Sequence, residues 1–137
     1  METINHECYV SLEVAKLLKE AGFKWGCRAA WDLTFPNEPY LNHAAVYPTD
    51  FNNDVDDILY APTLDVAQRW LREVKNISVN IFSTPCSYYE YSIRKINQLN
   101  YKDNTILALT ACRFYTYEGA QEAGIKTALE TILDKGE

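Results

Sequence analysis

The chain has 137 residues, of which 47% are hydrophobic and 23% are charged, and its formal net charge is −6. A chain of this length can bury a core without disulfides or a structural metal, so we expect one domain over residues 1–137. The negative charge opposes attraction to phosphate backbones, and we therefore do not expect nucleic acid as a partner.

The four cysteines, Cys8, Cys27, Cys86 and Cys112, lie far apart and form no C-x-x-C pair. No zinc template fits this spacing. The first residues, METINHECYV, lack the basic and apolar regions of a signal peptide, and no apolar run approaches the roughly 20 residues that span a bilayer. We expect a cytoplasmic protein with buried or inert thiols, no membrane partner, no metal and no cofactor.

The first predicted helix is SLEVAKLLKEAGF, residues 11–23. Ser11 is suited to the N-cap position, and Gly22 follows the apolar pattern as a stop signal. The apolar residues recur with helical spacing at Val14, Leu17, Leu18 and Ala21.

A strand is predicted next, at RAAWDLTF, residues 28–35. Its alternation places one set of side chains on a single side: Ala29, Trp31, Leu33 and Phe35. HAAVY, residues 43–47, is a candidate partner strand. The stretch from Pro36 to Pro62 is rich in Pro, Asn and Asp, and we expect an irregular excursion or a functional loop there. Within it DFNNDVDD resembles an EF-hand start, but Val55 and Ala61 replace the required Gly and Glu, so we predict no calcium site.

The second predicted helix, TLDVAQRWLREVK, begins after Thr63 as N-cap. Its Trp70 lies among basic residues and could either bind nucleic acid or pack in the core. Trp70 is in phase with an apolar stripe made by Ala67, Leu71 and Val74, which favours the core. Arg69 follows Asp65 by four residues and is expected to pair with it on a solvated face.

A hairpin is predicted from NISVNIFS, residues 76–83, and YYEYSIRK, residues 88–95. Alternation turns one set of side chains inward: Ile77, Val79, Ile81, Tyr89, Tyr91 and Ile93. It sends Phe82, Tyr88 and Arg94 outward with Asn80, and these three are our candidate binding residues. An exposed aromatic pair at Phe82 and Tyr88 indicates a protein partner, of which a second copy in a homodimer is the simplest. The alternative is that residues 36–62 fold over this face and bury both rings.

The remaining segments are TILALTACRFY, residues 105–115, and a helix from about Tyr117 to Asp134. The first is ambiguous between helix and strand, and its turn-like flanks favour a strand. The helix has one apolar face, made by Ile125, Ala128, Leu129, Ile132 and Leu133. Together these elements predict an α+β fold, with an antiparallel sheet of four to five strands and three helices on one face.

Three segments, YVSLEVAKLLKEAGF, APTLDVAQRWLREVKNISV and TYEGAQEAGIKTALETIL, make up a little over a third of the chain. In their order and spacing they resemble a family of small uncharacterised proteins encoded by Bacteroides phages, prophages and conjugative elements. The resemblance implies a mobile-element origin and a cytosolic setting, and it brings no active site. An acidic residue would be expected after TYE to complete a capping box with Thr116, but this chain has Gly119, so we expect a weaker cap.

Catalytic patterns are weak in this sequence, and we predict no catalytic residues. His6 and His43 are the only histidines, and phosphate-binding loops, dinucleotide fingerprints and H-E-x-x-H are absent. The leading hypothesis is a small non-enzymatic protein-binding or assembly accessory of a phage or mobile element. One alternative is an anti-defence protein that sequesters a small ligand among residues such as Trp25, Arg28 and Arg113. A further alternative is an enzyme of unrecognised type.

Overall fold

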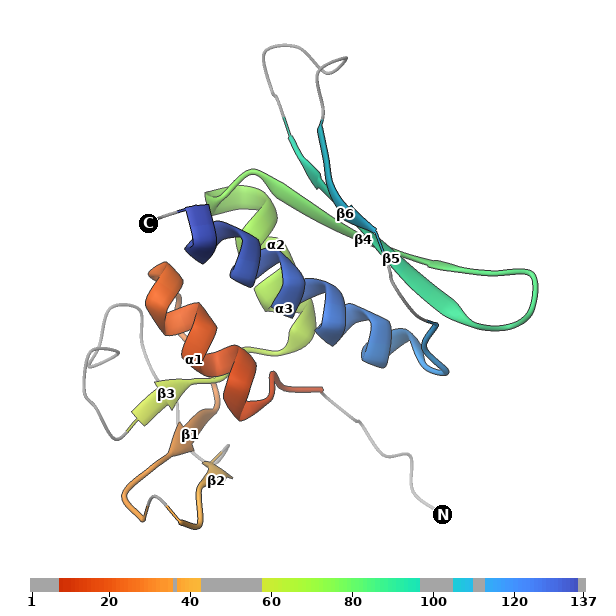
Figure 1. Ribbon diagram of the computed structural model, residues 1–137. Helices are drawn as coiled ribbons and strands as arrows, with labels where there is room; N and C mark the ends of the chain where they lie inside the picture. The colour runs from red at the N-terminus through yellow and green to blue at the C-terminus, as the bar shows by residue number, and fades with distance from the viewer. Residues whose placement is uncertain (1–7, 36, 43–57, 97–104, 110–112, 136–137) are drawn as a thin grey trace.

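The computed structural model describes residues 8–35, 37–42, 58–96, 105–109 and 113–135. Its helices and strands follow one another along the chain as α1 (Leu12–Ala21), β1 (Ala30–Asp32), β2 (Tyr40–Asn42), β3 (Ile58–Tyr60), α2 (Leu64–Val74), β4 (Ile77–Ser83), β5 (Tyr89–Lys95), β6 (Thr105–Leu109) and α3 (Tyr117–Lys135) (Figure 1). The fold is α+β, as the sequence predicts.

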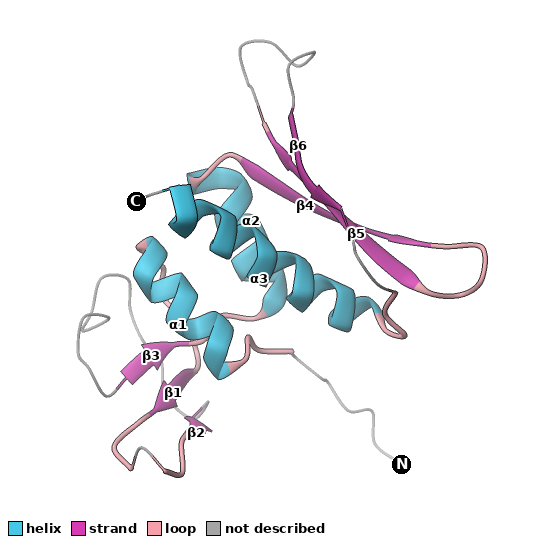
Figure 2. Ribbon diagram, in the orientation of Figure 1, coloured by secondary structure: helices cyan, strands magenta, loops and turns pink. Residues whose placement is uncertain are grey.

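The described strands form two antiparallel sheets (Figure 2). The smaller has the order β2-β1-β3 and the larger the order β4-β5-β6. The prediction of one sheet with four to five strands is therefore wrong, because the N-terminal strands pair among themselves. The predicted hairpin is confirmed as β4 and β5, and the ambiguous segment contains strand β6 at Thr105–Leu109.

The helix α3 lies at the centre of the molecule, between α1 and the sheet β4-β5-β6 (Figure 1). It also packs against α2, and α2 contacts the edge strand β4. The prediction that all three helices lie on one face of one sheet needs correction, because α1 packs on α3 and β3 instead. The side of the larger sheet that faces α3 is called the inner face below.

At the crossing of α3 over the inner face, Gly124 lets the helix approach the sheet closely. A Cβ atom at Gly124 would lie 2.8 Å from Val79 Cγ1 and 3.2 Å from Tyr91 Cγ. The inner face is buried under this helix, with Val79 and Ile93 in the core. The core is continuous through α2, where the Trp70 ring meets the Phe23 ring edge-on at 5.4 Å. Trp70 is 2% exposed, so its predicted place in the core is confirmed.

The predicted starts of α1 and α2 are confirmed in their capping geometry. The Ser11 and Thr63 hydroxyls accept from the backbone N–H groups of the third residue along, at 3.2 and 3.3 Å. Gly22 ends α1 with φ 98°, a left-handed conformation that suits glycine. In α3, the Thr116 hydroxyl accepts from Gly119 N–H at 2.9 Å. The glycine has no side chain to return the bond, so the capping box is half-formed.

Two details of the α2 prediction are wrong. Val74, assigned to the apolar stripe, is exposed because it lies in the last turn, beyond the end of the packed interface. Arg69 pairs with Glu73 at 2.8 Å and not with Asp65. The reason is that the Asp65 carboxylate accepts a hydrogen bond from Gln121, while the Arg69 guanidinium lies over the Trp25 ring.

A relay of side-chain amides joins α3 to the consecutive elements α2 and β4. The buried Gln121 of α3 donates through Nε2 to Asp65 Oδ1 at 2.7 Å and to Gln68 Oε1 at 2.8 Å, both on α2. Gln68 Nε2 in turn donates to the backbone oxygen of Val79, on β4. The side of β4 away from β5 is therefore held by α2 at this point.

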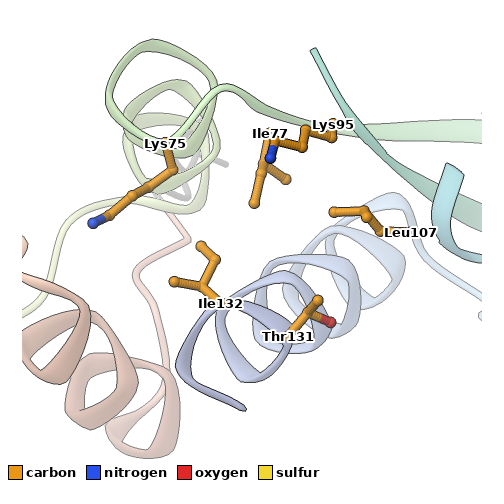
Figure 3. Close-up of a pocket in the computed structure, with 6 residues that line it drawn as sticks. All are labelled: Lys75, Ile77, Lys95, Leu107, Thr131 and Ile132. Atoms are coloured by element: carbon orange, nitrogen blue, oxygen red, sulfur yellow. The ribbon is translucent and has the colours of Figure 1, made fainter. Parts of the chain in front are cut away.

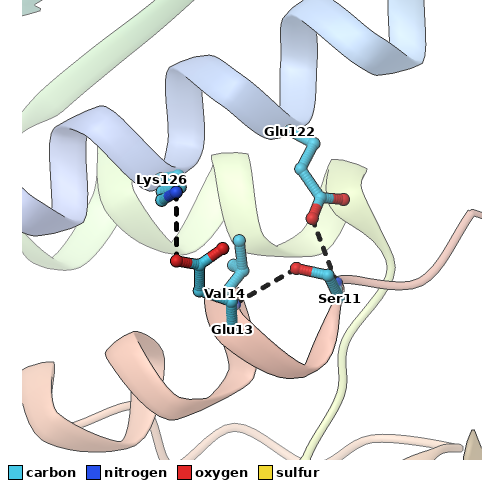
Figure 4. Close-up of polar contacts among 5 residues, drawn as sticks. All are labelled: Ser11, Glu13, Val14, Glu122 and Lys126. Atoms are coloured by element: carbon cyan, nitrogen blue, oxygen red, sulfur yellow. Dashed lines mark hydrogen bonds and ion pairs between the residues drawn. The ribbon is translucent and has the colours of Figure 1, made fainter.

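The helices α1 and α3 are tied by two polar contacts (Figure 4). Ser11 N–H donates to Glu122 Oε2 at 3.3 Å, and Lys126 Nζ lies 3.1 Å from Glu13 Oε2. The hydrogen bond to Glu13 raises the pKa of Lys126. The Lys126–Glu13 pair is exposed and such ion pairs contribute little to stability, while the Ser11–Glu122 hydrogen bond is partly buried, so the register of α1 on α3 is set mainly by the core.

The smaller sheet corrects the predicted strand at residues 28–35. Only Ala30–Asp32 is strand, and Phe35 is exposed instead of inward, because the chain turns after Asp32. Hydrogen bonds from Thr34 and Tyr40 fix this turn and lower the pKa of Asp32. The stretch 36–62 is not wholly irregular, since it contains β2 and β3. HAAVY and the acidic DFNNDVDD lie outside the described residues.

Candidate functional site

The face of the larger sheet that is turned away from α3, called the outer face below, carries exposed apolar side chains. Cross-strand partners share a face, so the strand pairing shows which residues lie on the outer face. They are Ser78, Asn80 and Phe82 on β4, Glu90, Ser92 and Arg94 on β5, and Ile106 and Leu109 on β6. Phe82 is 45% exposed, Ile106 49% and Leu109 62%. No helix among the described residues covers this face, since the contacts of α3 with the sheet are made on the inner side.

At the hairpin end of the outer face, aromatic and basic side chains gather. The segment that leads into α3 runs beside β5, where Phe114 and Tyr89 exchange backbone hydrogen bonds of 2.8 and 3.0 Å. Phe114 turns to the inner side, with its ring 6.2 Å from that of Tyr91. Alternation then sends the two neighbours of Phe114 to the outer side.

Those two neighbours, Arg113 and Tyr115, complete a group with Tyr88 that we call the Tyr–Arg cluster. The Tyr115 ring lies 5.3 Å from the Tyr88 ring, and the Arg113 guanidinium lies 5.6 Å above the same Tyr88 ring. Arg113 also approaches Glu90, with 3.7 Å between Nε and Oε2. Tyr115 is 81% exposed. Tyr and Arg, together with Trp, are the residue types most enriched at the energetic centres of protein interfaces.

The three residues predicted for binding all lie on the outer face, but they do not form one cluster. Phe82 is opposite Glu90, next to the Tyr–Arg cluster, whereas Arg94 is opposite Ser78 at the other end of the hairpin. Four residues of strand separate the two ends, or about 13 Å. Tyr88 is partly buried by its neighbours, while Phe82 and Arg94 are exposed.

The alternative in which residues 36–62 cover Phe82 and Tyr88 receives no support from the described part of that stretch. Residues 40–42 and 58–60 belong to the smaller sheet. Just after it, Ala61 N–H donates to the backbone oxygen of Ala29, and Val10 N–H donates to that of Pro62. Residues 43–57 lie outside the described residues.

Sequence reasoning missed four members of this surface: Ile106, Leu109, Arg113 and Tyr115. The first two depend on a register shift between β5 and β6 beside Ile93 and Arg94, which changes which residues of β6 turn outward. Alternation within RFY, residues 113–115, was a usable signal for the last two. It could be read only after this segment had been assigned an extended conformation.

Charges on β5 are arranged symmetrically about the middle of the outer face. Glu90 and Arg94 lie two residues to either side of Ser92, which is itself buried among its neighbours. Arg94 is exposed, and the Glu90 side chain is 30% exposed. An acid and a base at equal distances from one centre form a pattern that can match a second copy of itself.

Two observations on the described residues bear on catalytic chemistry. Burial raises the pKa of the Cys27 thiol to about 12, so this cysteine is not a thiolate at neutral pH. Cys8 and Cys86 are exposed, so of the three described cysteines only Cys27 has the buried position that was one of the two expectations for the thiols. No three His, Cys, Asp or Glu side chains of the described segments form a group that could hold a metal ion.

Two of the three residues proposed for a small-ligand pocket, Trp25 and Arg113, lie in different parts of the fold. Trp25 packs near Phe23, at 6.3 Å between ring centroids, and under Arg69. Arg113 belongs to the Tyr–Arg cluster, on the outer face of the larger sheet.

Among the helices of the described residues, none has the length and apolar character to cross a membrane.

No protein-family model, curated protein or solved structure matches this chain. The function of the outer face must therefore be inferred from its own chemistry.

Proposed function

We propose that this protein is a non-enzymatic assembly protein whose outer face binds a second copy of the same chain. The observation that supports this most directly is the set of exposed apolar side chains on an uncovered sheet face: Phe82, Ile106 and Leu109. Large apolar side chains left exposed on an uncovered sheet face are a feature of protein interfaces. The phage or mobile-element setting implied by the sequence resemblance remains part of this proposal.

Self-pairing is favoured by the positions of Glu90 and Arg94. Two sheets that pack face to face lie about 10 Å apart, with side chains of both in between. A two-fold axis that lies between the sheets, crosses the strands at right angles and passes over Ser92 places Glu90 of one copy against Arg94 of the other. The symmetry repeats this pair, so one interface gains two ion pairs from two residues.

The Tyr–Arg cluster extends this interface toward the hairpin loop. Its two tyrosines give large contact area at low entropy cost, and Tyr115 has most of its surface free. Arg113 balances Glu90 within the single chain, so that Glu90 is not left as an isolated charge when the face is covered.

The experiment uses charge reversal and sedimentation equilibrium. Wild type should be a dimer, and Glu90→Arg and Arg94→Glu should each be folded monomers, because each reversal sets like charges against each other across the axis. Mixing the two variants should restore a dimer, since every Arg of one chain then meets a Glu of the other. The matched control is Arg28→Glu, an exposed reversal outside this face, which should remain dimeric.

Two results would contradict the proposal. The first is a wild type that is monomeric at all accessible concentrations. The second is a pair of reversed variants that fail to associate when mixed, although each is folded. A Phe82→Ser, Tyr88→Ser double variant separates interface from core: a folded monomer supports the interface, whereas loss of the fold in a monomeric protein means that the rings belong to the core.

A further inference from the structure

A cavity of about 180 Å³ opens between the inner face of the larger sheet and the last turns of α3 (Figure 3). It lies at the end of the sheet opposite the hairpin loop, where β4 begins and β5 ends. Six residues line it: Lys75, Ile77, Lys95, Leu107, Thr131 and Ile132. Among these six described residues, the floor is aliphatic and the only charged groups are the two lysines.

Lys95 occupies a position where the strand pattern calls for an apolar residue. It pairs with Ile77 across the strands, and Ile77 is buried on the inner face. Tyr91 and Ile93, which precede Lys95 by four and two residues on the same face, are buried as well. A lysine at the end of this row brings a positive charge to the mouth of an otherwise apolar cavity. In Figure 3 its side chain extends along Ile77.

Lys75 adds a second positive charge nearby. It follows α2, and Asn76, with φ 59°, then turns the chain into β4. The stem of Lys75 lines the cavity (Figure 3). Its ammonium group lies 5.6 Å from the centre of the Trp70 ring. Within the described residues, neither Lys75 nor Lys95 takes part in an ion pair.

The size and chemistry of this cavity narrow the class of ligand. An apolar cavity of about 150 Å³ accepts benzene, so the space of 180 Å³ holds a body of about six to eight carbon atoms. Ile77, Leu107 and Ile132 favour an apolar body, while Lys95 favours an anionic group at the mouth. A carboxylate attached directly to such a body satisfies both requirements.

We propose that this cavity is a binding site for a carboxylate carried on a compact apolar body, with Lys95 as the group that pairs with the anion. The body lies against Ile77, Leu107 and Ile132, and Lys75 contributes positive potential from the rim. Both a free monocarboxylic acid and the C-terminal residue of a peptide offer this chemistry. The site faces α3 and is separate from the outer face, so it stands independently of the proposed dimer.

The test is an NMR titration of the ¹⁵N-labelled protein with benzoate, benzyl alcohol and inorganic phosphate. Benzoate should shift the amide signals of Ile77, Leu107 and Ile132. Benzyl alcohol should bind at least about threefold more weakly because it lacks the charge, and phosphate should not reach these amides. Equal binding of benzyl alcohol would overturn the role of the anion, and equal binding of phosphate would overturn the role of the apolar body.

A peptide arm identifies the source of the carboxylate. Acetyl-Gly-Gly-Leu is compared with its C-terminal amide, and the amide should fail to bind. A peptide that binds more tightly than benzoate assigns the site to a chain terminus, and the reverse order assigns it to a free acid. If neither the peptide nor benzoate shifts the three amides, the proposal is overturned.

Variants then locate the site. Lys95→Gln should weaken benzoate about threefold or more, and Lys75→Gln should have a smaller effect, because its ammonium group lies over Trp70. Thr131→Leu places a larger side chain in the cavity from α3, so it fills part of the space. It should abolish binding while the thermal melting temperature is retained. Lys24→Gln, an exposed lysine elsewhere, is the matched control and should bind as wild type. Unchanged binding in both Lys95→Gln and Thr131→Leu would overturn the assignment.

Discussion

Gly124→Ala tests the closest contact between α3 and the larger sheet. In an unconstrained helix this change stabilises by about 1 kcal/mol, because alanine is the better helix former. Here the new Cβ atom would lie 2.8 Å from Val79 Cγ1, whereas carbon atoms pack comfortably at about 3.5–4.0 Å. The helix would have to move by about 1 Å, away from a sheet that holds much of the core.

Over-packing of this kind costs about 1–3 kcal/mol. Set against the gain of about 1 kcal/mol in helix propensity, this leaves an expected net loss of up to about 2 kcal/mol in the free energy of unfolding. Tyr91 Cγ, at 3.2 Å from the new Cβ atom, limits the room for relief on the other side. The assay is urea denaturation followed by circular dichroism, with equal slopes required for the variants compared.

Val79→Ala provides the control for this reasoning. It removes Cγ1, so in its background Gly124→Ala should be close to neutral or stabilising, and the double-mutant cycle should show a coupling of about 1–2 kcal/mol. A Gly124→Ala protein that is more stable than wild type, with no coupling to Val79, would refute the close approach of α3 to β4.

Three further predictions concern the core and its polar groups. Trp70→Ala should cost about 3–5 kcal/mol because it empties a large buried site, and Arg72→Ala under about 0.5 kcal/mol; denaturant midpoints in the opposite order would contradict the packing of α2. At pH 7, Gln121→Glu should lower the free energy of unfolding by about 2 kcal/mol or more, because a carboxylate cannot donate to Asp65, and acidification that protonates the new side chain should restore this stability. Equal stability of the variant at pH 7 and at the acidic pH would exclude the relay. Cys27 should resist alkylation at pH 8 while exposed Cys86 reacts, as mass spectrometry of the native protein can show. Burial raises the pKa of Cys27 to about 12, so the contribution of the Cys27 thiol to stability should fall as pH rises from 9 toward 12.

Local signals in the sequence were sufficient for the helices and the hairpin. Ser11, Thr63 and Gly22 act through bonds within a few residues of themselves, so their capping roles follow from spacing alone. The burial of Trp70 follows from helical phase. The phase argument failed at Val74, because periodicity does not say where along a helix its packing partner ends.

Long-range pairing could not be obtained in the same way. Nothing in RAAWDLTF indicates that its partner strands are Tyr40–Asn42 and Ile58–Tyr60. The sequence therefore predicts one sheet where the structure has two. The partner of Asp65 is Gln121, 56 residues further along, and this contact displaced the expected local pair with Arg69. For the candidate site, alternation placed Phe82, Tyr88 and Arg94 on one face. It could not add Tyr115, whose neighbour Phe114 bonds to β5 across 25 residues of chain.

The central position of α3 also constrains when the chain can fold during its synthesis. This helix contacts α1, α2 and all three strands of the larger sheet, and residues 117–135 are made after every one of these elements. Until the ribosome has released that segment, the apolar sides of α1 and the hairpin have no common partner to pack against. The nascent chain therefore carries its future core exposed until α3 has been made, and chaperones that hold unfolded chains have an opportunity to bind it before this core can form.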